Sequence, residues 1–219
     1  MPAEAPRKRR GGKSKPRVRH HVNPLGFVHE VELPSREALF RRPALPLEVD
    51  LGSMHGEFIL ERAAREPERN FLGLEIRAPL VDEVNERIRR RGLENAACVL
   101  CNANTAFSRL FAPGSLAAVY VHVPDPWFKN RHRKRRLVTA ELVRQIADAL
   151  APGGRFRFMT DYEEYAREVA ALVAACPELE NPAGPGAMEV PEEGRVLTNR
   201  EAWHLRRGDP IHRWVWVRR

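Results

Sequence analysis

The chain has 219 residues and a formal charge of +8, a length that suits one large domain with a substantial core. It contains no run of roughly eighteen apolar residues, and no apolar segment follows its basic N-terminus, which argues against a membrane span and a secretory signal. Its three cysteines are an odd number and suggest no disulfide framework. We therefore expect a cytoplasmic protein.

The positive charge is concentrated at the N-terminus. Residues 1–20 contain eight lysines and arginines and one acid, together with several prolines and glycines. They carry too little apolar surface to order on their own, so we expect a basic disordered tail that binds a polyanion. Residues 21–43 show weak periodicity and scattered prolines, which predicts an irregular extension ahead of a domain over residues 44–219.

Strand and helix signals alternate through the domain. The predicted strands cover residues 45–51, 71–76, 96–101, 116–123, 155–160 and 213–217, and the predicted helices cover residues 57–65, 79–91, 139–150 and 162–175. Residues 102–115 have no clear pattern, and residues 181–194, rich in Pro, Gly and acid, are expected to form a flexible loop. This alternation indicates an α/β fold with a mainly parallel, Rossmann-like sheet, helices on both faces and an antiparallel C-terminal strand.

Polar side chains follow the first three predicted strands. Asp50 leads into a turn that contains Gly52, Glu75 ends the second strand, and Asn102 follows the third. The carboxyl ends of parallel strands meet at one edge of a sheet, where a glycine turn admits a ligand and an acid accepts hydrogen bonds from a ribose diol. An amide could bind an adenine edge. Together they predict an adenosine-containing cofactor, although each alone could be a turn or packing residue.

The fourth predicted strand ends in the densest cluster of functional groups. Asp125 lies between two prolines, Trp127 follows the second of them, and Lys129 and six basic residues, 131–136, come next. An aromatic ring can stack on a base, a carboxylate can accept from the base's N–H edge, and cations can hold flanking phosphates. The cluster indicates chemistry on a nucleic-acid base, whereas the turn alone could be a proline-stiffened surface loop.

These motifs resemble those of the tRNA (guanine-N7-)-methyltransferases, which are class I S-adenosylmethionine-dependent methyltransferases. The resemblance rests on the glycine turn after Asp50, the block at residues 123–136, Asp161 after the fifth strand, and residues 198–201 ahead of Gly208. It implies the class I methyltransferase fold and methyl transfer from S-adenosylmethionine to N7 of a guanine in the variable loop of tRNA. Met54, Val123 and Asn102 depart from the usual family residues, which are glycine, phenylalanine and an acid.

The resemblance also implies roles for individual residues. Asp125 would be catalytic. The cofactor would be contacted by Asp50, Gly52, Glu75, Asn102 and Asp125; the substrate by Lys129, Asp161, Thr198, Asn199, Arg200 and Glu201; and RNA by Arg131, His132, Arg133, Lys134, Arg135 and Arg136.

Some of these residues have an alternative structural interpretation. Asp161 precedes a predicted helix and could cap it, and Thr198 with Glu201 has the spacing of a capping box. Cys98 and Cys101 lie three residues apart on a predicted strand, so they should point to opposite faces as core cysteines. The histidines show no ligand spacing, so no metal is expected.

Two other functions are weighed beside the methyltransferase. A non-catalytic RNA-binding protein on a degenerate Rossmann-like fold is suggested by Met54 in the glycine turn. A nicotinamide oxidoreductase is disfavoured, because the chain has no Tyr-x-x-x-Lys pair and the basic run would have no use. The expected partner is tRNA. The sequence does not distinguish a monomer from a homodimer.

Overall fold

The computed structural model describes residues 22–27, 32–190 and 194–219. Within these residues a seven-stranded sheet has the order β3-β2-β1-β4-β5-β7-β6. Its strands are β1 (Leu47–Leu51), β2 (Asn70–Glu75), β3 (Ala96–Leu100), β4 (Leu116–His122), β5 (Leu150–Thr160), β6 (Leu179–Glu180) and β7 (His212–Arg218). Strands β1 to β5 are parallel, and β7 is antiparallel to β5 and β6. The predicted α/β class and the antiparallel last strand are confirmed.

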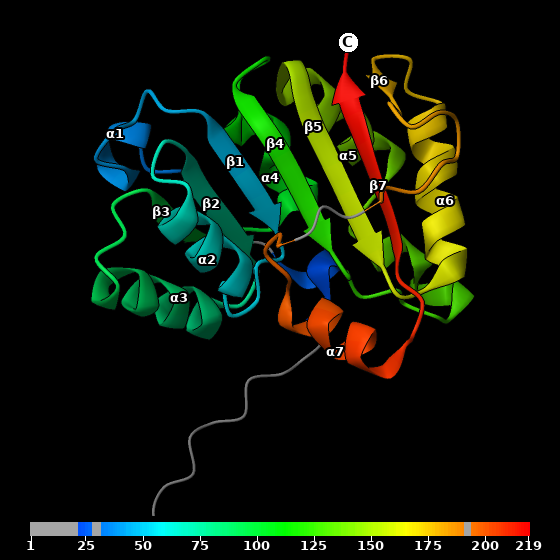
Figure 1. Cartoon of the computed structure of the whole chain (residues 1–219), viewed down its shortest axis with the longest axis horizontal. Coiled ribbons are helices and arrows are strands. Elements are labelled where there is room, and N and C mark those ends of the chain that lie inside the picture. Colours follow the sequence, from blue (N-terminus) through cyan, green and yellow to red (C-terminus); the bar gives the residue numbers. More distant parts are fainter. Residues whose placement is uncertain (1–21, 28–31, 191–193) are drawn as a thin grey trace, which may run out of the picture.

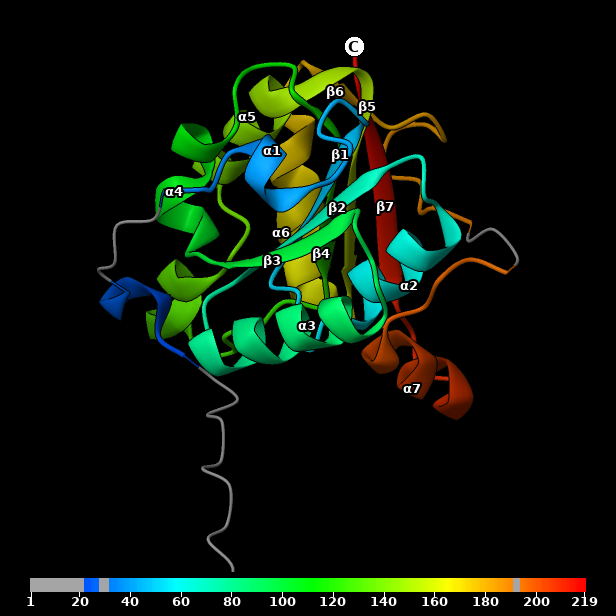
Figure 2. The ribbon, with the colours of Figure 1, turned by 90° about the vertical axis from the view of Figure 1, so that its left-hand side faces the viewer.

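Helices cover both faces of the sheet (Figures 1 and 2). Helices α2 (Glu57–Arg65) and α3 (Ala78–Arg90) bury their apolar residues against one face, in a core that includes Phe71 and Tyr120. Helices α4 (Ala103–Leu110), α5 (Ala140–Ala149) and α6 (Glu163–Ala174) pack on the other face, in the larger core. The chain thus forms the three-layer arrangement that a parallel sheet requires.

Several elements were not predicted. Helix α4 lies in the segment without a clear pattern, α7 (Asn199–Arg207) precedes β7, and β6 has only two residues. Helix α7 buries only Glu201 and His204, so it has no apolar stripe from which a helix can be recognised. The predicted tail lies outside the described residues. The described part of the extension holds only two short elements, η1 (Pro24–Gly26) and α1 (Arg36–Leu39).

The predicted core cysteines are confirmed. Cys98 and Cys101 are buried free thiols that belong to the cores on opposite faces of the sheet. Burial raises the pKa of Cys98 to about 12 and that of Cys101 to about 11, so both thiols stay protonated. Trp214 and Trp216 share one face of β7, and their rings stack with centroids 6.1 Å apart.

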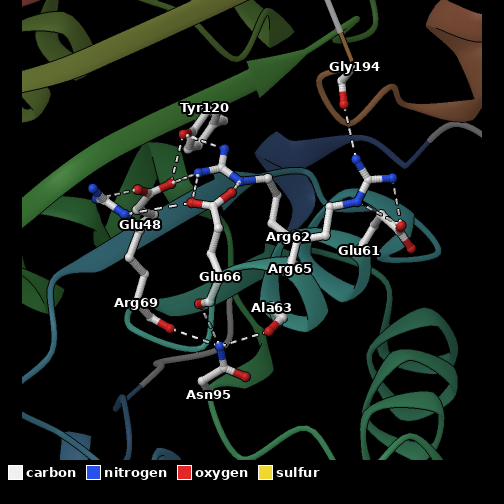
Figure 3. A network of polar contacts seen from close by, with 10 residues as sticks. All are labelled: Glu48, Glu61, Arg62, Ala63, Arg65, Glu66, Arg69, Asn95, Tyr120 and Gly194. Carbon is white, nitrogen blue, oxygen red and sulfur yellow. Dashed lines mark hydrogen bonds and ion pairs between the residues drawn. The ribbon is translucent and has the colours of Figure 1, made fainter.

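A buried polar network lies beside β1 and β4, on the same face as α2 (Figure 3). Glu48, which is 4 % exposed, accepts hydrogen bonds from Arg62 at 3.0 Å, Arg69 at 2.8 Å and the Tyr120 hydroxyl at 2.7 Å. Burial and the Glu48 charge raise the pKa of Tyr120 far above its usual range, so its hydroxyl remains a donor. Glu66 also binds Arg62, so every charge in the network has a partner of opposite sign.

None of the helices in the described ranges combines the length and the apolar composition needed to cross a membrane.

Candidate functional site

A cavity of about 550 Å³ lies at the carboxyl ends of the central strands. It occupies the point where the strand order reverses, with β2 on one side of β1 and β4 on the other, which is where open α/β sheets bind ligands. All five predicted cofactor residues line it, namely Asp50, Gly52, Glu75, Asn102 and Asp125. Thr198, Asn199 and Arg200 line it as well, whereas Lys129, Asp161 and Glu201 do not.

A second cavity, of about 680 Å³, lies beside α2 and is lined by residues of β1, β4 and β5. Its lining includes Glu48, Arg62 and Arg157, whose charges pair within the protein. Among the described residues, Phe58 and His122 alone line both cavities. The strand-end cavity is therefore the candidate site, because the acids predicted from the strand ends converge there.

Glu75 is held rigidly at the end of β2. Its side chain is 1 % exposed, and its carboxylate accepts from the Met54 backbone N–H at 2.9 Å and from the Arg77 backbone N–H at 3.0 Å. The Arg77 Nε also donates to it at 2.8 Å. Arg77 was not predicted, although its place two residues beyond Glu75 puts both side chains on the same side of an extended segment.

Met54 has a left-handed backbone conformation, with a φ of 52°. This conformation costs a non-glycine residue about 1 to 2 kcal/mol, which explains why a glycine would suit this position. It also turns the Met54 N–H toward Glu75. The glycine turn therefore keeps its geometry despite the substitution, and the Met54 side chain lies partly exposed at the cavity.

Asp50 is paired with a histidine that the sequence did not connect to it. The Nδ1 atom of His122 lies 3.1 Å from an Asp50 carboxylate oxygen, and both side chains are largely buried. The edge of Phe58 packs against the imidazole with ring centroids 4.4 Å apart. Among the residues that the structure describes, no three potential metal ligands come together.

Both polar atoms of the Asn102 side-chain amide form hydrogen bonds within the protein. Its Oδ1 accepts from the Asn104 backbone N–H at 3.2 Å, which caps α4, and its Nδ2 donates to the Pro24 carbonyl at 2.9 Å. Asn102 therefore caps α4, a role that the sequence did not predict. Because it still lines the cavity, a role beside a ligand stays a prediction.

The turn after β4 carries Asp125 and Trp127 in a strained conformation. Val123 and Trp127 have φ values of 44° and 46°, which are unusual for non-glycine residues and especially for a β-branched one. Such residues cost on the order of 1 to 3 kcal/mol each and persist only where their surroundings hold them. The Val123 N–H donates to the Met159 carbonyl at 2.7 Å, and the Arg135 guanidinium lies 5.1 Å from the Trp127 ring centroid. Strain of this kind is concentrated at functional sites.

A second acid, which was predicted to contact the substrate, lies next to helix α7. Asp161 is bound by Arg200 at 2.8 Å and by His204 at 2.9 Å. It does not cap α6, because the N-cap residue is Tyr162 and makes no side-chain cap. Burial works to raise the pKa of Asp161, but the hydrogen bond and charge of Arg200 outweigh it and lower the pKa below its usual value.

Half of the predicted capping box is present at α7. The Thr198 hydroxyl accepts from the Glu201 N–H at 3.1 Å, as a cap should. The Glu201 carboxylate, 1 % exposed, instead binds Arg195 and Arg213, which joins α7 to β7. These two arginines lie too far from Glu201 in sequence to be read as helix partners.

One residue of the predicted RNA-binding run is buried. Arg136 was expected to touch RNA, but its side chain is 2 % exposed and lies beneath the turn, against α6. The other five basic residues of the run are at least partly exposed.

Comparisons with known proteins bear on this site. A family model described as "Putative methyltransferase" matches residues 44–214. A tRNA (guanine-N(7)-)-methyltransferase of Thermosynechococcus vestitus is 40% identical over 204 residues, which cover 92% of this chain and 95% of that protein. The enzyme of the same name from Leifsonia xyli is 42% identical over 80% of this chain and 75% of its own. The chain belongs to the tRNA (guanine-N7-)-methyltransferase family.

Solved structures agree with the family in fold. The aminoglycoside resistance methyltransferase NpmB1 matches with a TM-score of 0.53 at 17% identity, over 84% of this chain and 90% of its own. A geranyl diphosphate C-methyltransferase from Streptomyces coelicolor, solved with S-adenosyl-L-homocysteine, matches with a TM-score of 0.53 at 14% identity, over 84% of this chain and 75% of its own. At these identities the likeness shows the class I methyltransferase fold of the family and nothing about the substrate.

Proposed function

We propose that this chain transfers a methyl group from S-adenosylmethionine to N7 of a guanine in the variable loop of tRNA. The observation that carries the proposal is the convergence of Asp50, Glu75 and Asp125 on one strand-end cavity, beside the strained Trp127 turn. The names of the relatives support the same reaction. We place the reaction in the cytoplasm, which suits a protein with three free thiols.

The donor set of the cavity fits S-adenosylmethionine. Glu75 is buried at the end of β2, where an acid accepts hydrogen bonds from a ribose diol. Asp50 supplies a second carboxylate for the positively charged end of the donor, and Gly52 lets the backbone approach it. Asn102 borders the place for the adenine. When bound, the sulfonium supplies an electrophilic methyl group.

Guanine N7 has an in-plane lone pair and no proton, so its attack on that methyl group needs no general base. The protein must align the nucleophile with the methyl carbon, which is worth at most about 7 to 11 kcal/mol as effective concentration. We assign this task to Asp125, whose carboxylate accepts from the N1–H and N2–H edge of guanine and stabilises the charge that develops on the purine. We assign the remaining substrate contacts to Lys129, Asp161, Thr198, Asn199 and Arg200, whereas the buried Glu201 holds α7 in place through Arg195 and Arg213.

The decisive experiment is incubation with a labelled methyl donor and total tRNA, followed by nucleoside analysis. We expect label in 7-methylguanosine of tRNA only. Calorimetry with S-adenosylmethionine in the absence of RNA separates this enzyme from an RNA-binding protein that has lost its donor site. Donor binding without any labelled 7-methylguanosine would contradict the proposed reaction.

Replacing Glu75 by Ala is expected to weaken donor binding by about 1.5 to 3 kcal/mol, which is the usual contribution of hydrogen bonds to a charged group. The measurement is the dissociation constant of S-adenosylhomocysteine by calorimetry, so no turnover is required. Glu94→Ala is the matched control, since Glu94 pairs with the exposed Arg41 and neither residue lines the cavity. An unchanged constant for the Glu75 variant would mean that this acid serves only to hold Met54 and Arg77.

A further inference from the structure

The basic run is arranged around a three-residue repeat. Residues Asn130–Arg135 form a 3-10 helix, η2, which follows the Trp127 turn directly. In such a helix, side chains three residues apart lie on the same side. The six basic residues that begin at Arg131 therefore fall into three pairs, and each pair faces a different part of the molecule.

The first pair, Arg133 and Arg136, binds helix α6. Arg133 lies 2.7 Å from Glu164 and 2.9 Å from Glu168, and Arg136 pairs with the same Glu168. The Arg136 guanidinium also lies 4.7 Å from the centroid of the buried Tyr165 ring. The charges of both arginines are thus paired with carboxylates of α6.

Arg136 also reaches the turn that carries the catalytic candidates. Its Nε donates to the Pro126 carbonyl at 2.7 Å. That carbonyl belongs to the peptide bond between Pro126 and Trp127, the residue with a φ of 46°. A single buried guanidinium therefore links α6 to the strained end of the turn.

The second pair, His132 and Arg135, packs on Trp127. The His132 ring meets the indole edge-on with centroids 5.8 Å apart, and the Arg135 guanidinium lies 5.1 Å from the indole centroid. Partial burial and the neighbouring charges of Arg135, Arg131 and Lys129 lower the pKa of His132. This pair supports the indole from the side of η2.

The third pair, Arg131 and Lys134, faces solvent. Both residues are exposed, and neither has an ion pair with an acid in the described part of the chain. Arg131 makes one side-chain contact, from Nε to the His132 ring nitrogen at 3.3 Å. Its charge and that of Lys134 are not neutralised by a carboxylate, unlike those of the first pair.

We propose that, within η2, only Arg131 and Lys134 bind RNA phosphates by charge. Arg136, which shares the carboxylate of Glu168 with Arg133, is a positioning residue for the turn that carries Asp125. This inference rests on the proposed function. It divides the basic run by role: one face holds the polyanion, one supports Trp127, and one anchors the turn to α6. Long-range attraction and alignment at the reacting atoms then depend on different cations.

The test compares a double variant, Arg131→Ala with Lys134→Ala, with the single variants Arg136→Lys and Glu168→Gln. The readouts are the dissociation constant for tRNA at several salt concentrations and the turnover at saturating tRNA. The control is Arg144→Ala with Arg167→Ala, which removes the same charge from exposed pairs on α5 and α6.

The double variant should weaken tRNA binding at least tenfold and lower the log–log salt slope by about 1.4 to 1.8, as expected for two lost phosphate contacts. Its turnover at saturation should stay within about twofold of the wild type, because mass action restores the complex. The Arg144 and Arg167 control should change neither quantity by more than about twofold.

Arg136→Lys should lower turnover at saturation more than tenfold, while the tRNA dissociation constant and the salt slope stay close to those of the wild type. A lysine keeps the charge but cannot bind Pro126 and Glu168 in the fixed geometry of a guanidinium. Glu168→Gln, which lies outside the cavity and leaves Arg136 in place, should lower turnover in the same direction, and thermal melts show whether each variant is folded.

The division is overturned if Arg136→Lys or Glu168→Gln flattens the salt slope as much as the double variant does. It is also overturned if the double variant binds tRNA normally, or if folded Arg136→Lys and Glu168→Gln both turn over normally. A failure of the proposed function looks different, since the wild type itself would then form no 7-methylguanosine. The tRNA-binding measurements would still decide which cations contact RNA.

Discussion

Replacing Asp125 by Ala is expected to lower turnover at saturating tRNA and donor by more than about a hundredfold, a loss of roughly 2.7 kcal/mol in transition-state stabilisation. Asp125 lines the cavity at the end of β4, within a turn whose strained ends are held by β5 and by Arg136. A carboxylate on a turn whose backbone is held in this way can bind the guanine edge with little reorganisation during the reaction. The measurement is steady-state formation of 7-methylguanosine.

Two comparisons sharpen this experiment. Asp125→Asn keeps the size of the side chain but can no longer accept from two N–H groups as an anion, so it should lose most of the same activity. Asp148→Ala serves as the matched control, because Asp148 is exposed on α5 and does not line the cavity. A folded Asp125→Ala variant with a near-normal rate would refute the proposed role.

Replacing Glu48 by Ala is expected to lower the free energy of unfolding by about 3 to 5 kcal/mol, the usual cost of removing one partner of a buried ion pair. Arg62, Arg69 and the Tyr120 hydroxyl would lose an acceptor that is 4 % exposed (Figure 3). Glu66 still binds Arg62, which favours the lower end of this range. Urea unfolding, compared at equal slope, measures the change.

The control for Glu48 is Glu61→Ala on α2. Glu61 pairs with Arg65 at 2.8 Å, but both side chains are about half exposed, so the loss should stay within about 1 kcal/mol. If the two variants unfold at similar urea concentrations, burial of the Glu48 network contributes little. The network would then stabilise the fold no more than an exposed ion pair does.

The sequence by itself determined six of the seven described strands, all except β6, and the edge of the sheet at which the site lies. Strands β1 and β2 are continuous runs of buried residues, a pattern expected only of strands covered on both faces. Since the carboxyl ends of parallel strands must meet, Asp50, Glu75 and Asp125 could be predicted to converge before any coordinates were known. The antiparallel direction of β7 beside β5 was also expected and is confirmed, although the connection ahead of it contains α7.

Only the tertiary structure decided which polar groups meet one another. Helix α7 buries only the polar residues Glu201 and His204, and ion pairs from Glu201 to Arg195 and Arg213 hold it in place, which no local periodicity reveals. Arg136 has the same side chain as the other arginines of the basic run, yet it lies beneath the turn because it pairs with Glu168 on another helix. A sequence pattern records spacing along the chain, whereas the role of a charge depends on the carboxylate, carbonyl or solvent that it faces after folding.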